Sequence, residues 1–224
     1  MQTMSKKKIF FLMPSLVGGG AENALVKILK AFDYDRYCVT LLLVSYNGFY
    51  IDQVPKEVEV RYLFKNDKLV RLLAFLQKKY GFVTPLKWAF KRAVNHNYDT
   101  AVSFLDGNFT DLLFYLDSKT KKLAWVHSSY ISNKNFNKFH RDPKYLERII
   151  ETRYKKLDTI VFVSNDAKNE FIEVMGEYKD MPVLYNLFDE ENIKLKAAMP
   201  ITAYNEQEFS FIAVGSLIPV KGYD

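Results

Sequence analysis

The chain has 224 residues, of which 49% are apolar and 26% are charged, and its formal net charge is +6. This composition excludes a disordered chain, because it supplies enough apolar side chains for a core. A single cysteine excludes an intramolecular disulfide and fits a reducing compartment, and no apolar stretch approaches the roughly 18 residues of a membrane span, so we expect a cytoplasmic protein.

The first predicted strand lies near the start of the chain and has some features of a signal peptide. Lys6, Lys7 and Lys8 precede the apolar run 9–13, as a basic region precedes an apolar one in a signal. The run is short, however, ends at Pro14 and is followed by glycines rather than by a small-residue cleavage site. We therefore interpret it as a buried strand.

Apolar runs and helical patterns alternate along the rest of the chain. The predicted strands are 8–13, 37–44, 57–62, 99–104, 121–126, 158–163, 182–185 and 209–214. The predicted helices are 21–31, 68–80, 84–95, 109–116, 143–156 and 165–175. Alternation of this kind predicts an α/β fold with a doubly wound, mostly parallel, Rossmann-like sheet. We expect Cys38 to be buried in the second strand.

The pattern changes near residue 190. Residues 190–208 have no clear period and contain Pro200, so they are the best candidate for a linker. We expect an N-terminal domain at 1–189 and, at 209–224, the first strand and turn of a truncated second domain. A strand without its crossover helix is not a natural end for a domain.

A run of three glycines follows the first strand and opens the first helix. Gly18, Gly19 and Gly20 allow a ligand to approach the backbone closely, and the start of a helix favours a phosphate. The dinucleotide fingerprint is not met, because Asn23 stands at its third glycine position and no acidic residue ends the second strand. The turn is a candidate phosphate site, with an unliganded strand-to-helix turn as the alternative.

Polar residues follow other predicted strands, where open parallel sheets bind ligands. His127, Ser128 and Ser129 follow one strand and Asp106 follows another. An imidazole at such a place can exchange hydrogen bonds or protons with a bound group, although a lone histidine is as often structural. For Asp106 the alternative is a turn or a helix cap. No group of residues has the spacing of metal ligands, so we expect no metal.

Five short motifs occur in the order seen in glycosyltransferase family 4. They are Gly-Gly-Ala-Glu at 19–22, His127 after its strand, Val163-Ser164, Val183-Leu184-Tyr185-Asn186, and Val214-Gly215-Ser216-Leu217 with Pro219, Lys221 and Gly222. The chain resembles these retaining GT-B enzymes, which have two Rossmann-like domains. Essentially the whole chain is similar to their acceptor-binding N-terminal domain followed by the first strand of the donor-binding domain.

The resemblance implies transfer of a sugar from a nucleotide-sugar to an acceptor hydroxyl with retention, in the synthesis of a bacterial surface polysaccharide or glycolipid. It implies no cofactor and no obligatory metal. Gly19 and Gly20 would lie near the donor diphosphate and His127 near the transferred sugar. Lys221 would neutralise the diphosphate, and Ser216 stands where the family usually has an arginine. The candidates for acceptor binding are Glu22, Asp106, Ser128 and Ser129.

Two other classes of function stay open, and the resemblance limits what this chain can do. Since the acidic segment that contacts the donor in this family is missing, we expect the polypeptide to be inactive by itself. One alternative is a non-catalytic nucleotide- or sugar-binding module, which gains support if His127 points into the core or the glycine turn faces solvent. The other is an inverting GT-B enzyme with Asp106 as the base.

Cations gather between residues 65 and 97, a stretch with eight basic residues and one acidic residue. Basic helices that carry aromatic residues suit anionic lipid head groups, so we expect weak peripheral contact with the inner face of the membrane. The alternative is that the apolar stripes pack on the sheet and the cations are solvated. No nucleic-acid-binding module matches the pattern, and no such partner is expected.

The segment 128–142 directly follows His127 and is polar. It is either a loop that gates or contacts the acceptor or an ordinary disordered surface loop. The sequence favours neither interpretation.

Overall fold

The protein is described here by a computed structural model, which covers residues 5–65, 68–70, 72–73, 75, 84–95, 97–131, 133, 136–200, 209 and 211–215. The chain divides into two compact units, residues 1–186 and 187–224. The strands of the first unit are β1 (Lys7–Met13), β2 (Tyr37–Ser45), β3 (Glu59–Phe64), β4 (Thr100–Ser103), β5 (Lys121–Val126) and β6 (Thr159–Phe162). Its α-helices include α1 (Gly20–Lys30), α3 (Thr84–Ala93), α4 (Asn137–Arg141), α5 (Pro143–Thr152) and α6 (Asn165–Met175), and its 3-10 helices include η1 (Ile51–Gln53), η2 (Asn108–Tyr115) and η4 (Tyr154–Lys156).

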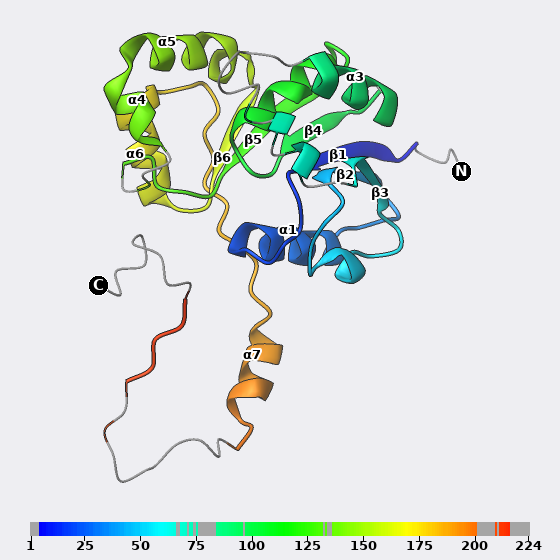
Figure 1. The fold of residues 1–224 in the computed structure, drawn as a ribbon. Helices are drawn as coiled ribbons and strands as arrows, with labels where there is room; N and C mark the ends of the chain where they lie inside the picture. Colours follow the sequence, from blue (N-terminus) through cyan, green and yellow to red (C-terminus); the bar gives the residue numbers. More distant parts are fainter. Residues whose placement is uncertain are drawn as a thin grey trace. The chain divides into compact units, whose positions relative to one another are not determined.

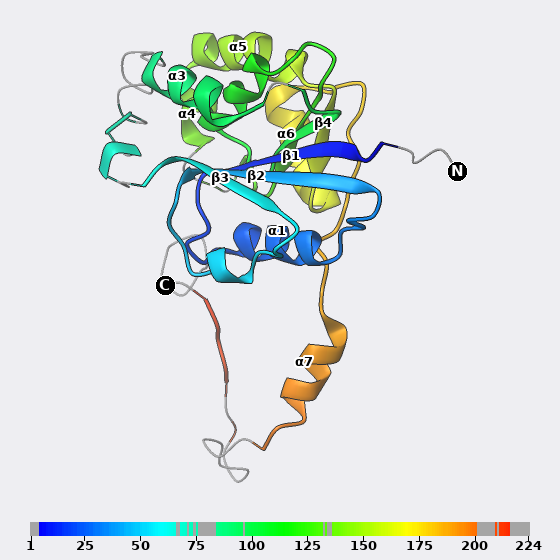
Figure 2. The same ribbon diagram turned by 90° about the vertical axis from the view of Figure 1, so that its right-hand side faces the viewer.

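The six strands form one sheet in the order β3-β2-β1-β4-β5-β6. Every pairing is parallel. Helix α1 covers one face of the sheet, and α3 and α5 lie on the other (Figures 1 and 2). Strands β2 and β3 are added on one side of β1, and β4, β5 and β6 are added on its other side. The gap between β1 and β4 is therefore the switch point of a doubly wound sheet. The predicted α/β, Rossmann-like fold is therefore confirmed.

Alternation along β1 explains the two apolar layers. Phe11 and Met13 pack in the same cluster as Leu25 of α1. Phe10 and Leu12 pack in another cluster, which includes Leu86 and Phe90 of α3. Since β1 lies in the middle of the sheet and its later residues are buried on both faces, the predicted buried strand is confirmed.

Side chains that accept hydrogen bonds from the first turn mark where two of the helices begin. The Ser164 hydroxyl accepts a hydrogen bond from the Ala167 N–H at 3.1 Å, at the start of α6. The Asp142 carboxylate accepts one from the Tyr145 N–H at 3.0 Å, and Pro143 occupies the first turn of α5. These contacts satisfy backbone donors that have no partner within the helix. At the other end of α6, Gly176 adopts a positive φ of +84°.

Three local predictions need correction. The predicted helix 109–116 is the 3-10 helix η2. The predicted strand 182–185 makes one isolated bridge to the sheet, between Val183 and Phe162, where the Leu184 N–H donates to the Phe162 carbonyl oxygen at 2.8 Å. Cys38 is exposed rather than buried, since the first residues of β2 extend past the helices that cover the later part of the strand.

The second unit is described by itself. Helix α7 (Glu190–Ala197) forms within the segment predicted as a linker, and the Asp189 carboxylate caps it by accepting a hydrogen bond from the Asn192 N–H at 3.1 Å. The described residues at 209 and 211–214 are almost fully exposed and do not form the predicted strand, because no described segment pairs with them. The predicted domain boundaries stay a prediction. Among the helices in the described parts of both units, none is long and apolar enough to cross a bilayer.

Candidate functional site

The candidate residues that the structure describes in the first unit lie at the carboxyl edge of the sheet. The glycine turn follows β1, Asp106 follows β4, and His127 follows β5. Strands β1 and β5 are separated only by β4, so their ends are about 10 Å apart at the usual spacing of strands. The edge next to a switch point is where doubly wound sheets bind ligands.

His127 and the start of α1 lie on the same face of the sheet as well as at the same edge. Trp125, two residues before His127, packs in the core cluster that contains the α1 side chains. Residues two apart in a strand point to the same face. The His127 ring lies 4.7 Å from the Phe104 ring and 6.1 Å from the Trp125 ring, measured between centroids. A glycine turn and an imidazole that contact the same ligand must lie on the same face, as they do here.

The glycine turn presents open backbone to solvent. Gly18 has a φ of +134°, which a residue with a side chain rarely adopts, and Gly19 is the N-cap of α1. Gly18, Gly19 and Gly20 are all exposed. A methyl group on Gly20 would meet nothing within 4 Å, whereas one on Gly19 would overlap the carboxylate of Glu22. The Glu22 carboxylate thus lies over the start of the helix, where the helix dipole favours negative charge.

His127 is neutral at physiological pH. Burial lowers the pKa of its imidazole to about 4, against the opposing effect of a hydrogen bond with the Phe104 backbone. Its Nε2 atom is buried and has no hydrogen-bond partner among the described residues. A buried polar atom of this kind calls for a partner such as a water molecule or a ligand group. Neutral imidazole can either donate or accept at that atom.

Asp106 does not cap the helix that follows it, so a helix cap is wrong as its role. The cap position belongs to Gly107, whose N–H donates to the Thr110 hydroxyl at 3.1 Å. Instead, Asp106 Oδ2 accepts hydrogen bonds from the phenol groups of Tyr130 and Tyr154. Its other oxygen, Oδ1, is buried without a partner among the described residues. Burial raises the pKa of this carboxyl group.

The two serines after His127 differ in their surroundings. The Ser129 hydroxyl donates to the carboxylate of Glu170 in α6, which also accepts from the Ile131 N–H at 3.3 Å. Ser128 is half-buried. The Ser129 hydroxyl is therefore used in a contact within the protein. Of the two serines, Ser128 is the better candidate for binding a ligand. Glu170 was not predicted, because it lies in the middle of a helix and belongs to no motif.

The segment 128–142 is anchored rather than disordered, as far as the structure describes it. The Tyr130 ring stacks on Phe136 at 4.2 Å and on Phe139 at 5.9 Å. Helix α4 forms within the segment, and the His140 ring lies 3.2 Å from the Tyr130 carbonyl oxygen. The aromatic rings of this otherwise polar segment thus pack in the core cluster that contains the buried residues of α6.

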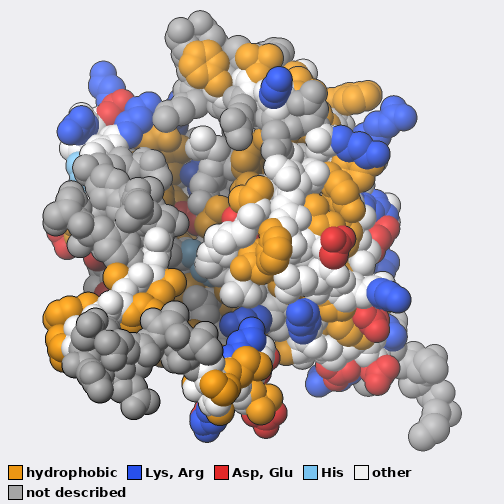
Figure 3. Space-filling view, turned by 60° about the horizontal axis from the view of Figure 1, so that its bottom comes forward, with side chains coloured by type: hydrophobic (Ala, Val, Ile, Leu, Met, Phe, Trp, Pro, Cys, Tyr) orange, Lys and Arg blue, Asp and Glu red, His pale blue; other side chains and the backbone are white. Residues whose placement is uncertain are grey.

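Two predicted residues, Ser216 and Lys221, lie outside the described residues, as do several basic residues of 65–97. Within that stretch, Leu86 and Phe90 of α3 are buried, as the packing alternative requires. Trp88, by contrast, is 64% exposed, and the Arg92 guanidinium lies 5.5 Å from its ring centroid. Hydrophobic side chains also lie at the surface next to Lys and Arg on the face shown in Figure 3.

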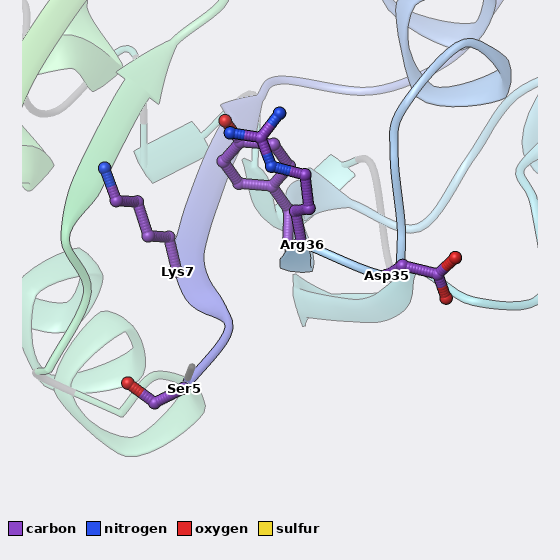
Figure 4. Close-up of a pocket in the computed structure, with 5 residues that line it drawn as sticks. Ser5, Lys7, Asp35 and Arg36 are labelled. Carbon is purple, nitrogen blue, oxygen red and sulfur yellow. The ribbon is translucent and has the colours of Figure 1, made fainter. Parts of the chain in front are cut away.

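A small cavity of about 150 Å³ lies at the amino edge of the sheet, away from the candidate site. Its lining residues are Ser5, Lys7, Asp35, Arg36 and Tyr37. Figure 4 shows that the Asp35 carboxylate points away from Lys7 and Arg36. The cavity contains none of the candidate residues. Within the described ranges, no group of three or more His, Cys, Asp or Glu could hold a metal ion.

No model of a protein family matches the chain, and no curated protein matches it. Two similar solved structures are of Anabaena Alr3699/HepE. The structure in complex with UDP and glucose is 20% identical, with a TM-score of 0.49, and the match covers 83% of this chain and 46% of that chain. The structure in complex with UDP-glucose is 19% identical, with a TM-score of 0.49, and the match covers 82% of this chain and 45% of that chain. The chain therefore spans less than half the length of these structures, and a likeness at this level identifies no activity for it.

Proposed function

We propose that the chain is the acceptor-binding part of a retaining GT-B glycosyltransferase related to family 4. It would move a sugar from a nucleotide-sugar to an acceptor hydroxyl, in the synthesis of a bacterial surface polysaccharide or glycolipid. One observation carries the proposal. An exposed glycine turn at the start of α1 and a neutral imidazole with an unpartnered Nε2 share one edge and one face of the sheet.

In the proposed reaction, the glycine turn stabilises the departing nucleoside diphosphate. Negative charge grows on this leaving group, and the backbone N–H groups at Gly19 and Gly20 are suited to it. One donor of this type contributes on the order of 3 kcal/mol to the transition state. Lys221 would add a cation and Ser216 a hydroxyl group. The proposal needs no cofactor and no metal, since the nucleotide-sugar is the substrate.

The proposed role of His127 is to hold the transferred sugar. With a pKa of about 4, its imidazole is neutral near pH 7, so it would bind a sugar hydroxyl rather than supply charge. Glu22, Asp106 and Ser128 are the proposed acceptor-binding residues. Ser129 would act through its contact with Glu170. The exposed Trp88 with Lys91 and Arg92 would provide a weak contact with an anionic membrane.

The proposal is tested with the protein expressed from its complete gene. UDP-, GDP- and dTDP-hexoses are offered together with p-nitrophenyl glycoside acceptors, and release of nucleoside diphosphate and the anomeric configuration of the product are measured. We expect turnover with retention for one donor, and a loss of about a hundredfold or more in His127→Ala. Tyr178→Phe is the control, because this phenol donates only to the Met175 carbonyl oxygen and should keep the wild-type rate.

A non-catalytic binding module is the second candidate, and two observations favour it. The imidazole of His127 packs against Phe104 and Trp125, and the glycine turn faces solvent. Binding of a nucleotide-sugar without any release of nucleoside diphosphate from the complete protein would select this module and reject the transferase.

A further inference from the structure

Asp106, one of the proposed acceptor-binding residues, belongs to a buried triangle of oxygen atoms. Its Oδ2 atom accepts from the Tyr130 phenol and from the Tyr154 phenol, the latter at 2.9 Å. The two phenol oxygens are 2.5 Å apart. All three oxygens are therefore within hydrogen-bond distance of one another.

The number of protons in this triangle indicates the charge of Asp106. Three oxygen pairs lie at hydrogen-bond distance, but the two phenols supply only two protons. An ionised carboxylate would leave one close pair of oxygens with no proton between them. A third proton on Oδ2 completes the ring, and Oδ1 is then a carbonyl oxygen that can only accept.

Burial and charge act on this carboxyl group in opposite directions. The Arg153 guanidinium, which is paired with the Asp111 carboxylate through contacts of 2.7 and 3.0 Å, lowers the pKa of Asp106. Burial is the largest influence on Asp106, and it raises the pKa of the carboxyl group.

Both phenols are held in place by packing. Tyr130 is stacked on Phe136, and the Phe171 ring meets it edge-on at 4.9 Å. Phe171 also meets Tyr154 edge-on at 5.0 Å. Both phenols therefore hold Oδ2 in place, one by donating to it and the other by accepting its proton, and Oδ1 is left buried without a partner among the described residues.

We propose that Asp106 is a neutral carboxyl group whose Oδ1 accepts a hydrogen bond from a hydroxyl group of a bound saccharide, with Tyr130 and Tyr154 as positioning residues. This inference rests on the proposed function, since it gives that site a hydroxyl-recognising position. It also excludes Asp106 as the base of an inverting enzyme, because a neutral carboxyl group has no electron pair of sufficient basicity to take the acceptor proton.

The protonation state is tested on the complete protein by carbon-13 NMR of aspartate carboxyl groups, with the Asp106 signal assigned from its absence in Asp106→Asn. We expect Asp106 to hold its proton to a higher pH than the other aspartates do, because burial raises the pKa of its carboxyl group. Tyr154→Phe removes a hydrogen bond that lowers the pKa of Asp106, so its titration should move to higher pH. Tyr178→Phe removes a neighbouring phenol that does not touch Asp106 and should not move it. Ionisation of Asp106 together with the other aspartates would overturn the inference.

Saccharide contact is tested by saturation-transfer NMR with methyl α-glucoside, α-galactoside and α-mannoside. We expect at least one to bind the wild type. Asp106→Asn, which keeps an acceptor oxygen, should bind within about threefold of the wild type. Asp106→Ala should bind about tenfold more weakly or worse, because it has no acceptor. Equal binding by Asp106→Ala, or no binding to the wild type, would overturn the inference.

The outcome is separable from that of the transferase assay. Release of nucleoside diphosphate without a saccharide contact at Asp106 would reject only the present inference. Saccharide binding that depends on Asp106 without any consumption of a nucleotide-sugar would reject the transferase and leave the hydroxyl-binding position standing.

Discussion

At the scale of single residues, Gly48 is a position where a side chain has no room. Its φ of +148° disfavours a side chain, and a methyl group there would overlap the backbone of Leu16. The Leu16 N–H donates to the Asn47 carbonyl oxygen at 2.9 Å, so neither segment can move away freely. The turn after β2 thus holds the loop that leads from β1 to the glycine turn.

We expect Gly48→Ala to lower the free energy of unfolding by about 2 kcal/mol or more, from backbone strain and overlap together. Gly20→Ala is the matched control, because its new methyl group meets nothing within 4 Å. Its stability should change by no more than about 0.5 kcal/mol. Urea unfolding measures the free energy of unfolding of both variants. Equal values would show that a side chain at position 48 fits beside the Leu16 backbone.

The buried imidazole of His127 should make stability depend on pH. Its pKa is about 4 in the folded protein and about 6.5 when unfolded, so the unfolded state binds the proton more readily. The contribution to stability is complete above about pH 6.5 and is lost as the pH falls towards 4. It amounts to at most about 3 kcal/mol.

His127→Gln should therefore lose less stability than the wild type between pH 7 and pH 4.5 in urea unfolding. If the free energy of unfolding depended on pH in the same way in the wild type and in His127→Gln, the His127 imidazole would have the same pKa in the folded and unfolded states.

At the scale of elements, α3 uses its two faces differently. Leu86 and Phe90 pack against the sheet, while Trp88, Lys91 and Arg92 are exposed. The packing alternative raised by the sequence thus describes one face of this helix. The other face keeps the composition that suits an anionic membrane surface.

We expect the variant with Trp88→Ala, Lys91→Ala and Arg92→Ala to bind vesicles of phosphatidylglycerol about thirtyfold more weakly than the wild type or worse, since each of the two surface cations contributes roughly 1 kcal/mol. Binding of the wild type should weaken with salt. The control, Arg141→Ala with Lys144→Ala, removes two exposed cations from α4 and α5. Cosedimentation that is unchanged by the α3 variant would reject the membrane contact.

At the scale of the whole molecule, the parallel sheet is what gathers the candidate residues. Every strand of the sheet points the same way, so the residues after β1, β4 and β5 meet at one edge. Helices on both faces bury the strands and leave this edge for ligands. The same architecture places the small amino-edge cavity at the opposite edge, which separates it from the site (Figure 4).

The sequence by itself determined the six strands of the sheet, to within two residues at each end. Continuous apolar runs such as 37–44 specify strands buried on both faces, and the glycines after β1 specify a tight turn into α1. Because parallel strands end at a common edge, the positions of Gly19, Gly20 and His127 at that edge followed from the order of elements alone.

Only the tertiary structure decided which partners these residues have. Asp106, Tyr130 and Tyr154 are 24 or more residues apart and share no motif, so their oxygen triangle has no signal in the sequence. The exposure of Cys38 and the low pKa of His127 depend on which helices and rings cover them. The physical reason is that periodicity along a chain records which face of an element is apolar, whereas burial and hydrogen bonding depend on neighbours that the fold brings from elsewhere.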